Sequence, residues 1–209
     1  MSEQIAQHLL DIGAVSLSPS APFTWSSGLK SPIYCDNRLT LSYPHVRTEI
    51  AHGLANLVRT HAPDADVIAG TATAGIPHAA LVSDLLGLPM IYVRGSAKGH
   101  GKKNLIEGEL HENENVVVIE DLISTGGSAL AAVEAIRAAG GNPLLVAAIF
   151  SYELPKATEA FQVTNVPFQV LTNYPTLVQV AKSRGMITTS EQEKLATWRK
   201  NPADESWLT

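Results

Sequence analysis

The stretch VVVIEDLISTGGSAL, residues 116–130, indicates the fold of this chain. Its first four residues are β-branched and apolar with no polar alternation, which is typical of a central parallel strand buried on both faces. From Gly127 onward, apolar residues recur every three to four positions, and Gly140 ends the pattern, as expected for a helix. The stretch therefore predicts a strand, a turn and a helix of a parallel sheet.

The turn between this strand and helix has the composition of an anion-binding loop. Ser124, Thr125, Gly126, Gly127 and Ser128 combine three hydroxyl groups with glycines that let backbone amides approach a ligand. The start of the following helix also favours negative charge. These features predict a phosphate site in the loop.

Two adjacent carboxylates, Glu120 and Asp121, precede the loop. They can accept hydrogen bonds from a vicinal diol or hold a divalent cation, but they would repel a bare phosphate. A phosphorylated ribose supplies both a phosphate and a diol. The alternative is that the acids cap the strand and the hydroxyls cap the helix. The complete string favours a phosphoribosyl site, and the chain contains neither G-x-x-x-x-G-K-[ST] nor G-x-G-x-x-G.

The overall composition indicates one α/β domain spanning residues 1–209. The chain is 45% hydrophobic and 17% charged, which suffices for one core. A net charge of −5 argues against nucleic acid as a partner. No secretory signal and no membrane span are visible, so we expect a cytoplasmic protein without a membrane partner. The single cysteine, Cys35, fits a reducing compartment and a structural role.

The remaining segments alternate between helix and strand patterns. Helices are expected at residues 3–12, 45–59 and 78–86, and strands at residues 66–70, 89–93, 144–150 and 168–171. Residues 22–40 indicate short strands and turns. Two more helices are expected after Pro175, the second opened by a capping box of Ser190 and Glu193. This order predicts a central parallel sheet flanked by helices.

The segment from residue 95 to 110, GSAKGHGKKNLIEGEL, has few apolar residues and a local positive charge. Lys98, His100, Lys102 and Lys103 lie in it. Long loops in compact domains are usually functional or disordered, and this one follows a predicted strand end. It is a candidate lid over a polyanion, with a solvated hairpin tip as the alternative.

The string EDLISTGGS resembles the PRPP-binding signature of the type I phosphoribosyltransferases, where PRPP is phosphoribosyl pyrophosphate. In that family the acid pair meets the ribose hydroxyls and the loop holds the 5-phosphate. The resemblance implies a PRPP site made of Glu120, Asp121, Leu122, Ile123, Ser124, Thr125, Gly126, Gly127 and Ser128. Residues 71–77, TATAGIP, resemble the pyrophosphate loop of the family, with an ordinary tight turn as the alternative.

Two further segments resemble the orotate phosphoribosyltransferases more narrowly. The pattern Arg94-x-x-x-Lys98-x-His100-Gly101 is similar to their mobile catalytic loop, and FTWSSGLKSPIYCDNR to the hood over orotate. The resemblance implies a hood at about residues 14–42 and a lid at residues 94–110. It also implies that Arg94, Lys98 and His100 act on PRPP in catalysis. Orotidine 5′-monophosphate and pyrophosphate would be the products, in pyrimidine biosynthesis.

The same resemblance implies a cofactor and a partner. Mg²⁺ would be bound through PRPP near Glu120 and Asp121. The family is homodimeric, with the lid of one subunit completing the site of the other. Ser124, between the 5-phosphate and the base, is expected to contact orotate.

Three departures from the family concern its positive charges. Many members have a lysine where Gly95 stands, and a lysine often stands where this chain has Ala74. Some also have an arginine where this chain has Ser151 and Tyr152. Lys30 and Arg38 of the hood are therefore expected to supply charge for the orotate carboxylate, with surface placement as the alternative for both.

Two other functions stay open from the sequence. One is a phosphoribosyltransferase for a purine or uracil, since the PRPP string would serve any base. The other is a non-catalytic PRPP-sensing regulator that binds nucleic acid, which the net charge of −5 disfavours.

Overall fold

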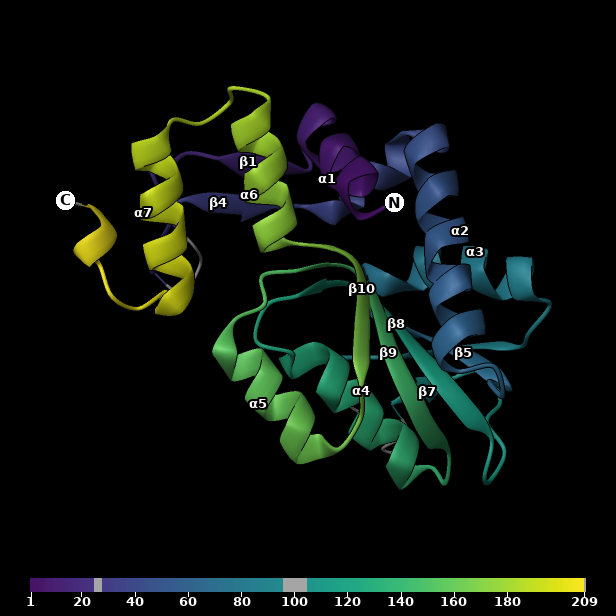
Figure 1. Ribbon diagram of the computed structural model, residues 1–209. Coiled ribbons are helices and arrows are strands. Elements are labelled where there is room, and N and C mark those ends of the chain that lie inside the picture. The colour runs from purple at the N-terminus through teal and green to yellow at the C-terminus, as the bar shows by residue number, and fades with distance from the viewer. Residues whose placement is uncertain (25–27, 96–104, 209) are drawn as a thin grey trace.

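The computed structural model describes residues 1–24, 28–95 and 105–208, and a six-stranded sheet lies at its centre (Figure 1). The strand order is β10-β9-β8-β5-β6-β7. The strands are β5 (Val67–Thr71), β6 (Met90–Val93), β7 (Ile106–Glu107), β8 (Asn115–Ile123), β9 (Asn142–Ser151) and β10 (Phe168–Asn173). Neighbouring strands are parallel except for β6 and β7, which are antiparallel. The predicted central parallel sheet is confirmed.

Helices cover both faces of this sheet, and the apolar residues form two clusters separated by it. On one face lie α1 (Ser2–Asp11), α2 (Pro44–His61) and α3 (Gly75–Leu86), and on the other α4 (Gly127–Ala138) and α5 (Pro155–Thr164) (Figure 1). The central strands explain this arrangement, because β5 is buried at all five positions and therefore needs cover on both sides.

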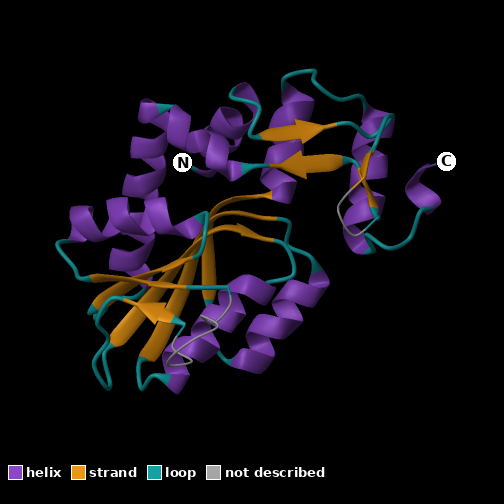
Figure 2. Cartoon of the chain, turned by 180° about the vertical axis from the view of Figure 1, so that it is seen from behind, coloured by secondary structure: helices purple, strands orange, loops and turns teal. Residues whose placement is uncertain are grey.

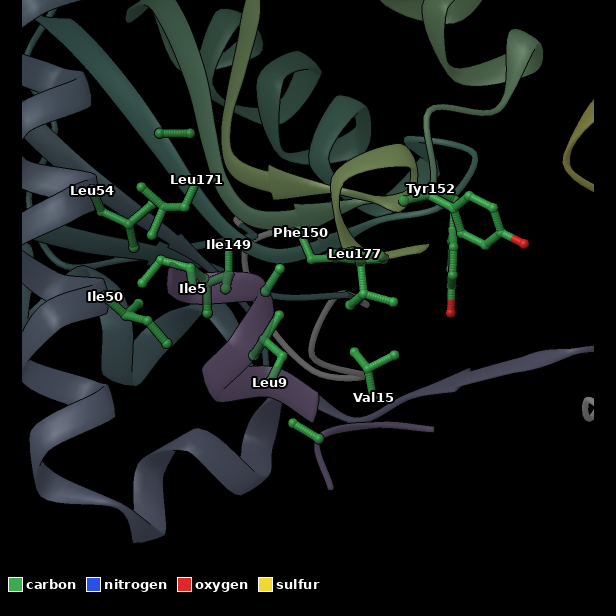
Figure 3. Packing of buried hydrophobic residues seen from close by; sticks show 14 of the residues in the cluster. Ile5, Leu9, Val15, Ile50, Leu54, Ile149, Phe150, Tyr152, Leu171 and Leu177 are labelled. Atoms are coloured by element: carbon green, nitrogen blue, oxygen red, sulfur yellow. The ribbon is translucent and has the colours of Figure 1, made fainter. Parts of the chain in front are cut away.

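The larger cluster joins the two ends of the chain (Figure 3). Ile5 and Leu9 of α1 and Leu54 of α2 meet Leu171 of β10 and Leu177 of α6 (Tyr174–Ser183). All five are buried, and each such side chain contributes about 1.5–3 kcal/mol when removed from water. The N-terminal helix is thereby held against the C-terminal strand of the sheet.

A second group of elements lies beyond the carboxyl ends of the strands. Two antiparallel pairs, β1 (Val15–Leu17) with β4 (Ile33–Cys35) and β2 (Phe23–Thr24) with β3 (Lys30–Ser31), precede the 3₁₀ helix η1 (Asn37–Ser42). They lie beside α6 and α7 (Thr189–Lys200) and the short η2 (Ser206–Leu208), as Figure 2 shows. The predicted short strands of residues 22–40 are confirmed, and we call residues 14–42 the hood.

An aromatic cluster joins the C-terminal helices to the end of β9. The ring of Trp198 lies 5.6 Å from that of Tyr174 and 5.9 Å from that of Tyr152. Such pairs add about 0.5–1.5 kcal/mol beyond the burial of their area. The end of α7 is therefore anchored beside the carboxyl edge of the sheet.

Three predictions of local structure were wrong or incomplete. The capping box of α7 is formed by Thr188 and Glu191, not by Ser190 and Glu193, because the helix begins two residues earlier than the predicted cap implied. Helix α5 was not predicted, since only Ala157 and Phe161 of it are buried. Strand β8 extends to Ile123, because pairing with β9 continues past its apolar run.

Among the residues that the structure describes, no helix is both long enough and apolar enough to cross a membrane.

Candidate functional site

The site lies at the carboxyl edge of the sheet, where parallel strands bring their following loops together. Strand β5 ends at Thr71 and leads into residues 72–74, with a cis peptide between Ala72 and Thr73. Its neighbour β8 carries Glu120 and Asp121 near its end and leads into residues 124–126. The two loops predicted to bind pyrophosphate and 5-phosphate are therefore neighbours.

Glu120 is buried and bonded to residues that flank both of these loops. Its Oε1 accepts a hydrogen bond of 2.6 Å from the Thr71 hydroxyl and one of 3.1 Å from the Asp121 amide. Its Oε2 accepts a bond of 2.6 Å from the Ser128 hydroxyl. Hydrogen bonds to a carboxylate are among the stronger ones, so this side chain ties β5, β8 and the start of α4 together.

Asp121 is held in place by the hood, and its pKa is raised. Burial, and then the nearby Glu120 carboxylate, raise the pKa of Asp121 from 3.8 to about 7. Its backbone oxygen accepts a 2.7 Å hydrogen bond from Asn37 Nδ2 of the hood. The ionised form of Asp121 is thus disfavoured in the ligand-free chain, and a nearby positive charge or hydroxyl donor would stabilise it.

The predicted phosphate loop has the backbone geometry that its glycines suggested. Gly126 has φ of +83°, and a Cβ there would lie 2.9 Å from Cε2 of Phe161. Helix α4 starts at Gly127, and its first turn closes with a 2.9 Å bond from the Leu130 amide to the Gly126 oxygen. The amides of residues 124–128 therefore precede or begin a helix, where an anion is favoured.

The loop after β5 approaches β8 equally closely, at Gly75. A Cβ on Gly75 would overlap the Ile119 backbone oxygen and the Thr71 hydroxyl. Only glycine therefore allows α3 to begin against β8. The assignment of this loop to pyrophosphate stays a prediction, beside the ordinary tight turn.

A cavity of about 200 Å³ lies between these elements. Thr71 and Ala72 from the loop after β5, Arg94 and Gly95 after β6, and Ser128 of α4 line it. Arg94 Nη1 is 3.5 Å from Glu107 Oε1 of β7, and the Arg94 side chain is partly buried. Arg94 and Ser128, predicted separately from sequence, thus lie on one cavity.

The other predicted residues of the lid, Lys98 and His100, lie outside the described residues. The same holds for Lys102 and Lys103 of that segment. Their predicted contacts with PRPP stay predictions.

The two hood cations predicted for orotate each have a local partner. Arg38 donates two bonds to Asp36, of 2.6 and 2.8 Å, and is exposed. The Lys30 ammonium donates a 2.8 Å bond to the Thr24 hydroxyl across the β2–β3 pair. Much of the charge of Arg38 is therefore already compensated. Burial raises the pKa of the Cys35 thiol, as expected for a structural residue.

Sequence reasoning placed Thr71 in a candidate loop but missed its bond to Glu120, and it missed Asn37, which bonds the Asp121 backbone. A polar residue ending the buried β5 strand is a signal that could have indicated Thr71. Asn37 has no such signal, since its contact joins residues 84 positions apart.

Comparison with known proteins agrees with this geometry. Residues 41–169 match the family model of the phosphoribosyl transferase domain. The chain is 60% identical over 209 residues to an orotate phosphoribosyltransferase of Bacillus cytotoxicus, covering 100% of both chains. It is 59% identical over 208 residues to that of Halalkalibacterium halodurans, covering 100% of this chain and 99% of the relative.

A solved structure shares the fold as well. The UMP synthase of Leishmania donovani superposes with a TM-score of 0.79 at 28% identity, covering 95% of this chain and 42% of that protein. The full-length identity to the two bacterial relatives decides the classification, because it includes the hood and C-terminal helices outside the matched domain. This chain therefore belongs to the orotate phosphoribosyltransferases.

Proposed function

We propose that the chain transfers the phosphoribosyl group of PRPP to orotate, giving orotidine 5′-monophosphate and pyrophosphate for pyrimidine biosynthesis. The observation that carries this proposal is the bond between Thr71 and Glu120. It joins the loop suited to pyrophosphate to the strand that carries the acid pair and the phosphate loop. PRPP carries a pyrophosphate and a 5-phosphate at opposite ends of one ribose, with the ribose hydroxyls between them.

In the proposed complex the 5-phosphate accepts hydrogen bonds from the amides and hydroxyls of residues 124–128. Asp121 accepts bonds from the ribose hydroxyls, which favours its ionised form. Glu120 already accepts three hydrogen bonds, so its main contribution is to hold Thr71 and Ser128 in place. This arrangement orients the anomeric carbon toward the Arg94 cavity on one side and the hood on the other.

Mg²⁺ is the proposed cofactor, bound through PRPP beside the acid pair. The raised pKa of Asp121 fits such a cation, because a positive charge would offset the repulsion between the two carboxylates. No cluster of three potential metal-ligating side chains occurs among the residues that the structure describes. When bound, the ion would help to neutralise the negative charge of pyrophosphate.

The lid residues complete the proposed mechanism. Breaking the bond at the anomeric carbon leaves positive charge on the ribose and negative charge on the departing pyrophosphate. Arg94, Lys98 and His100 would neutralise that pyrophosphate, and His100 could donate a proton to it. Closure of residues 94–110 would also exclude water that could attack the sugar. No side chain needs to act as a nucleophile.

The proposal extends to assembly and location. We infer a homodimer in which each lid serves the site of the partner subunit. Residues 1–209 are taken as one domain, and the single cysteine fits a cytoplasmic location.

A parallel assay tests this function against its alternatives. Purified protein with PRPP and Mg²⁺ is given orotate, uracil, hypoxanthine or xanthine, and pyrophosphate release is measured. We expect turnover with orotate at a kcat/KM far above that of the other bases. Preference for another base would reassign the substrate. PRPP binding without turnover of any base would support a regulator.

A further inference from the structure

A second pocket, of about 370 Å³, lies on the hood side of the phosphate loop. Ser124 and Thr125 form one wall, Leu29 of the hood another, and the start of α5 and the end of α7 the rest. Two side chains in this lining carry formal charge, Lys156 and Lys200, and both are positive. The pocket therefore suits an anion that adjoins the 5-phosphate.

The walls also suit a flat ring. Leu29, Leu154, Pro155 and Pro202 present apolar surface to the pocket, while its polar groups come from the loop and the two lysines. Ligand sites commonly combine apolar walls with a few polar groups that fix orientation. A planar heterocycle with one carboxylate has this distribution of polarity.

Neither lysine has a polar partner among the described residues. Lys156 and Lys200 make no hydrogen bond or ion pair with any of them, whereas Arg38 and Lys30 of the hood have the partners given above. Lys156 also lies in the first turn of α5, where a cation opposes the helix dipole. A residue that is unfavourable for its own helix is expected where function requires it.

The end of α7, which carries Lys200, is held in position by its neighbour. Arg199 Nη1 donates a 3.2 Å bond to Glu153 Oε2, and Asn173 Nδ2 donates a 2.8 Å bond to Glu153 Oε1. Glu153 lies two residues after the end of β9, in the same segment that leads to Lys156. One carboxylate thus fixes the distance between the two elements that carry the lysines.

We propose that Lys156 and Lys200 bind the carboxylate of orotate and thereby set the preference for orotate over bases that lack this group. The inference rests on the proposed function, and it names a source for the positive charge missing at Ser151 and Tyr152. The carboxylate stands on the ring carbon next to the attacking nitrogen but takes no part in the bond that forms, so we assign the two lysines to binding and specificity.

Two nucleotides that differ in this carboxylate provide the test. Orotidine 5′-monophosphate and uridine 5′-monophosphate differ only in the carboxylate on the base. The ratio of their Kd values therefore measures how much that carboxylate contributes to binding. Calorimetry would compare the wild type with Lys156→Met, Lys200→Met and the double variant. Lys182→Met is the control, since Lys182 does not line the pocket and its ammonium bonds the Thr189 hydroxyl instead.

We expect the wild type to bind orotidine 5′-monophosphate more tightly than uridine 5′-monophosphate. In the double variant the first Kd should rise at least about tenfold, as for loss of a charge-assisted hydrogen bond, and the second less than about twofold. Lys156→Arg should keep most of the preference, and Lys182→Met all of it. Circular dichroism shows whether each variant is folded, and the single variants carry the test if the double variant is not.

Two outcomes would overturn the inference. In the first, the variants of Lys156 and Lys200 raise the Kd values of both nucleotides by the same factor, which indicates that the lysines support the structure or bind the 5-phosphate. In the second, all of these variants keep the wild-type ratio of the two Kd values. If the wild type turns over orotate but the lysine variants keep the wild-type Kd ratio, only the inference about the lysines is wrong. A wild type without orotate turnover contradicts the proposed function itself.

Discussion

The Thr71 hydroxyl lies 2.6 Å from Glu120 Oε1, so the end of β5 is bonded to a carboxylate of the neighbouring strand β8. Both side chains are buried, and the same carboxylate accepts a bond from Ser128 at the start of α4. Elements separated in sequence therefore share one buried carboxyl group. Disturbing either partner should affect stability and ligand binding together.

Thr71→Val keeps the shape of the side chain and removes its hydroxyl. We expect a loss of about 1–3 kcal/mol in the free energy of unfolding, because Glu120 loses a donor while it stays buried. Urea denaturation measures this loss, and PRPP affinity by calorimetry should fall as well. Thr197→Val on the exposed face of α7 is the control and should change stability by less than about 0.5 kcal/mol. Equal effects of the two substitutions would contradict a special role for Thr71.

The raised pKa of Asp121 predicts a pH-dependent stability. Since the folded state holds this proton more tightly than the unfolded state, the stabilisation is complete below pH 3.8 and is lost as the pH rises to about 7. Asp121 should therefore lower the free energy of unfolding by up to about 1.4 kcal/mol per pH unit across that interval.

Comparison with Asp121→Asn isolates this effect from other groups. Burial lowers the pKa of His78 to about 4, which makes stability rise with pH over part of the same interval. Both proteins contain His78, so the difference between their unfolding curves reports Asp121. A difference that stays constant from pH 4 to pH 7 would show that Asp121 is not perturbed.

Gly126→Ala tests the geometry of the phosphate loop. The new methyl group would meet the Phe161 ring at 2.9 Å, and the positive φ of this position disfavours any Cβ. We expect a destabilisation of about 1–3 kcal/mol in urea denaturation. Gly127→Ala is the matched control, because its Cβ has 3.9 Å to its nearest neighbour and its φ is not positive. The loop geometry would be wrong if both variants were equally stable.

Subunit mixing tests the shared active site. Lys98→Ala and Asp121→Asn should each inactivate a homodimer, but a mixed dimer has one site with both residues intact. After equilibration of equal amounts, activity should recover to about one quarter of wild type, since half of the dimers are mixed. Mixtures as inactive as either parent would show that each subunit supplies its own lid.

Lys98→Ala tests whether the lid acts on the departing pyrophosphate. If Lys98 binds the transition state more strongly than PRPP, kcat and kcat/KM should both fall about a few hundredfold while KM changes little. Lys102→Ala and Lys103→Ala lie beyond the matched pattern and should each cost less than about threefold. Steady-state kinetics on the three variants distinguishes a positioned contact from a general positive field, which would make all three losses similar.

Much of the fold and part of the site followed from local sequence. A continuous apolar run identified β8, and glycine spacing identified the start of α4, because strand burial and turn geometry depend on neighbouring residues. The same local string marked Glu120, Asp121 and the loop after them as a ligand site. Helix α5 escaped prediction, since only two of its residues are buried and its apolar pattern is weak.

The amino-acid sequence by itself determined the strand–loop–helix unit, the acid pair and the positive charge of residues 95–110, because each of these depends on residues close together in the chain. Only the tertiary structure decided that Glu120 is bonded to Thr71, 49 residues away, while Asp121 keeps a raised pKa. It also placed Lys156 and Lys200 on one pocket beside Ser124. The physical reason is that parallel strand order and helix packing bring distant segments to one edge of the sheet, and these contacts leave no periodic pattern in the sequence.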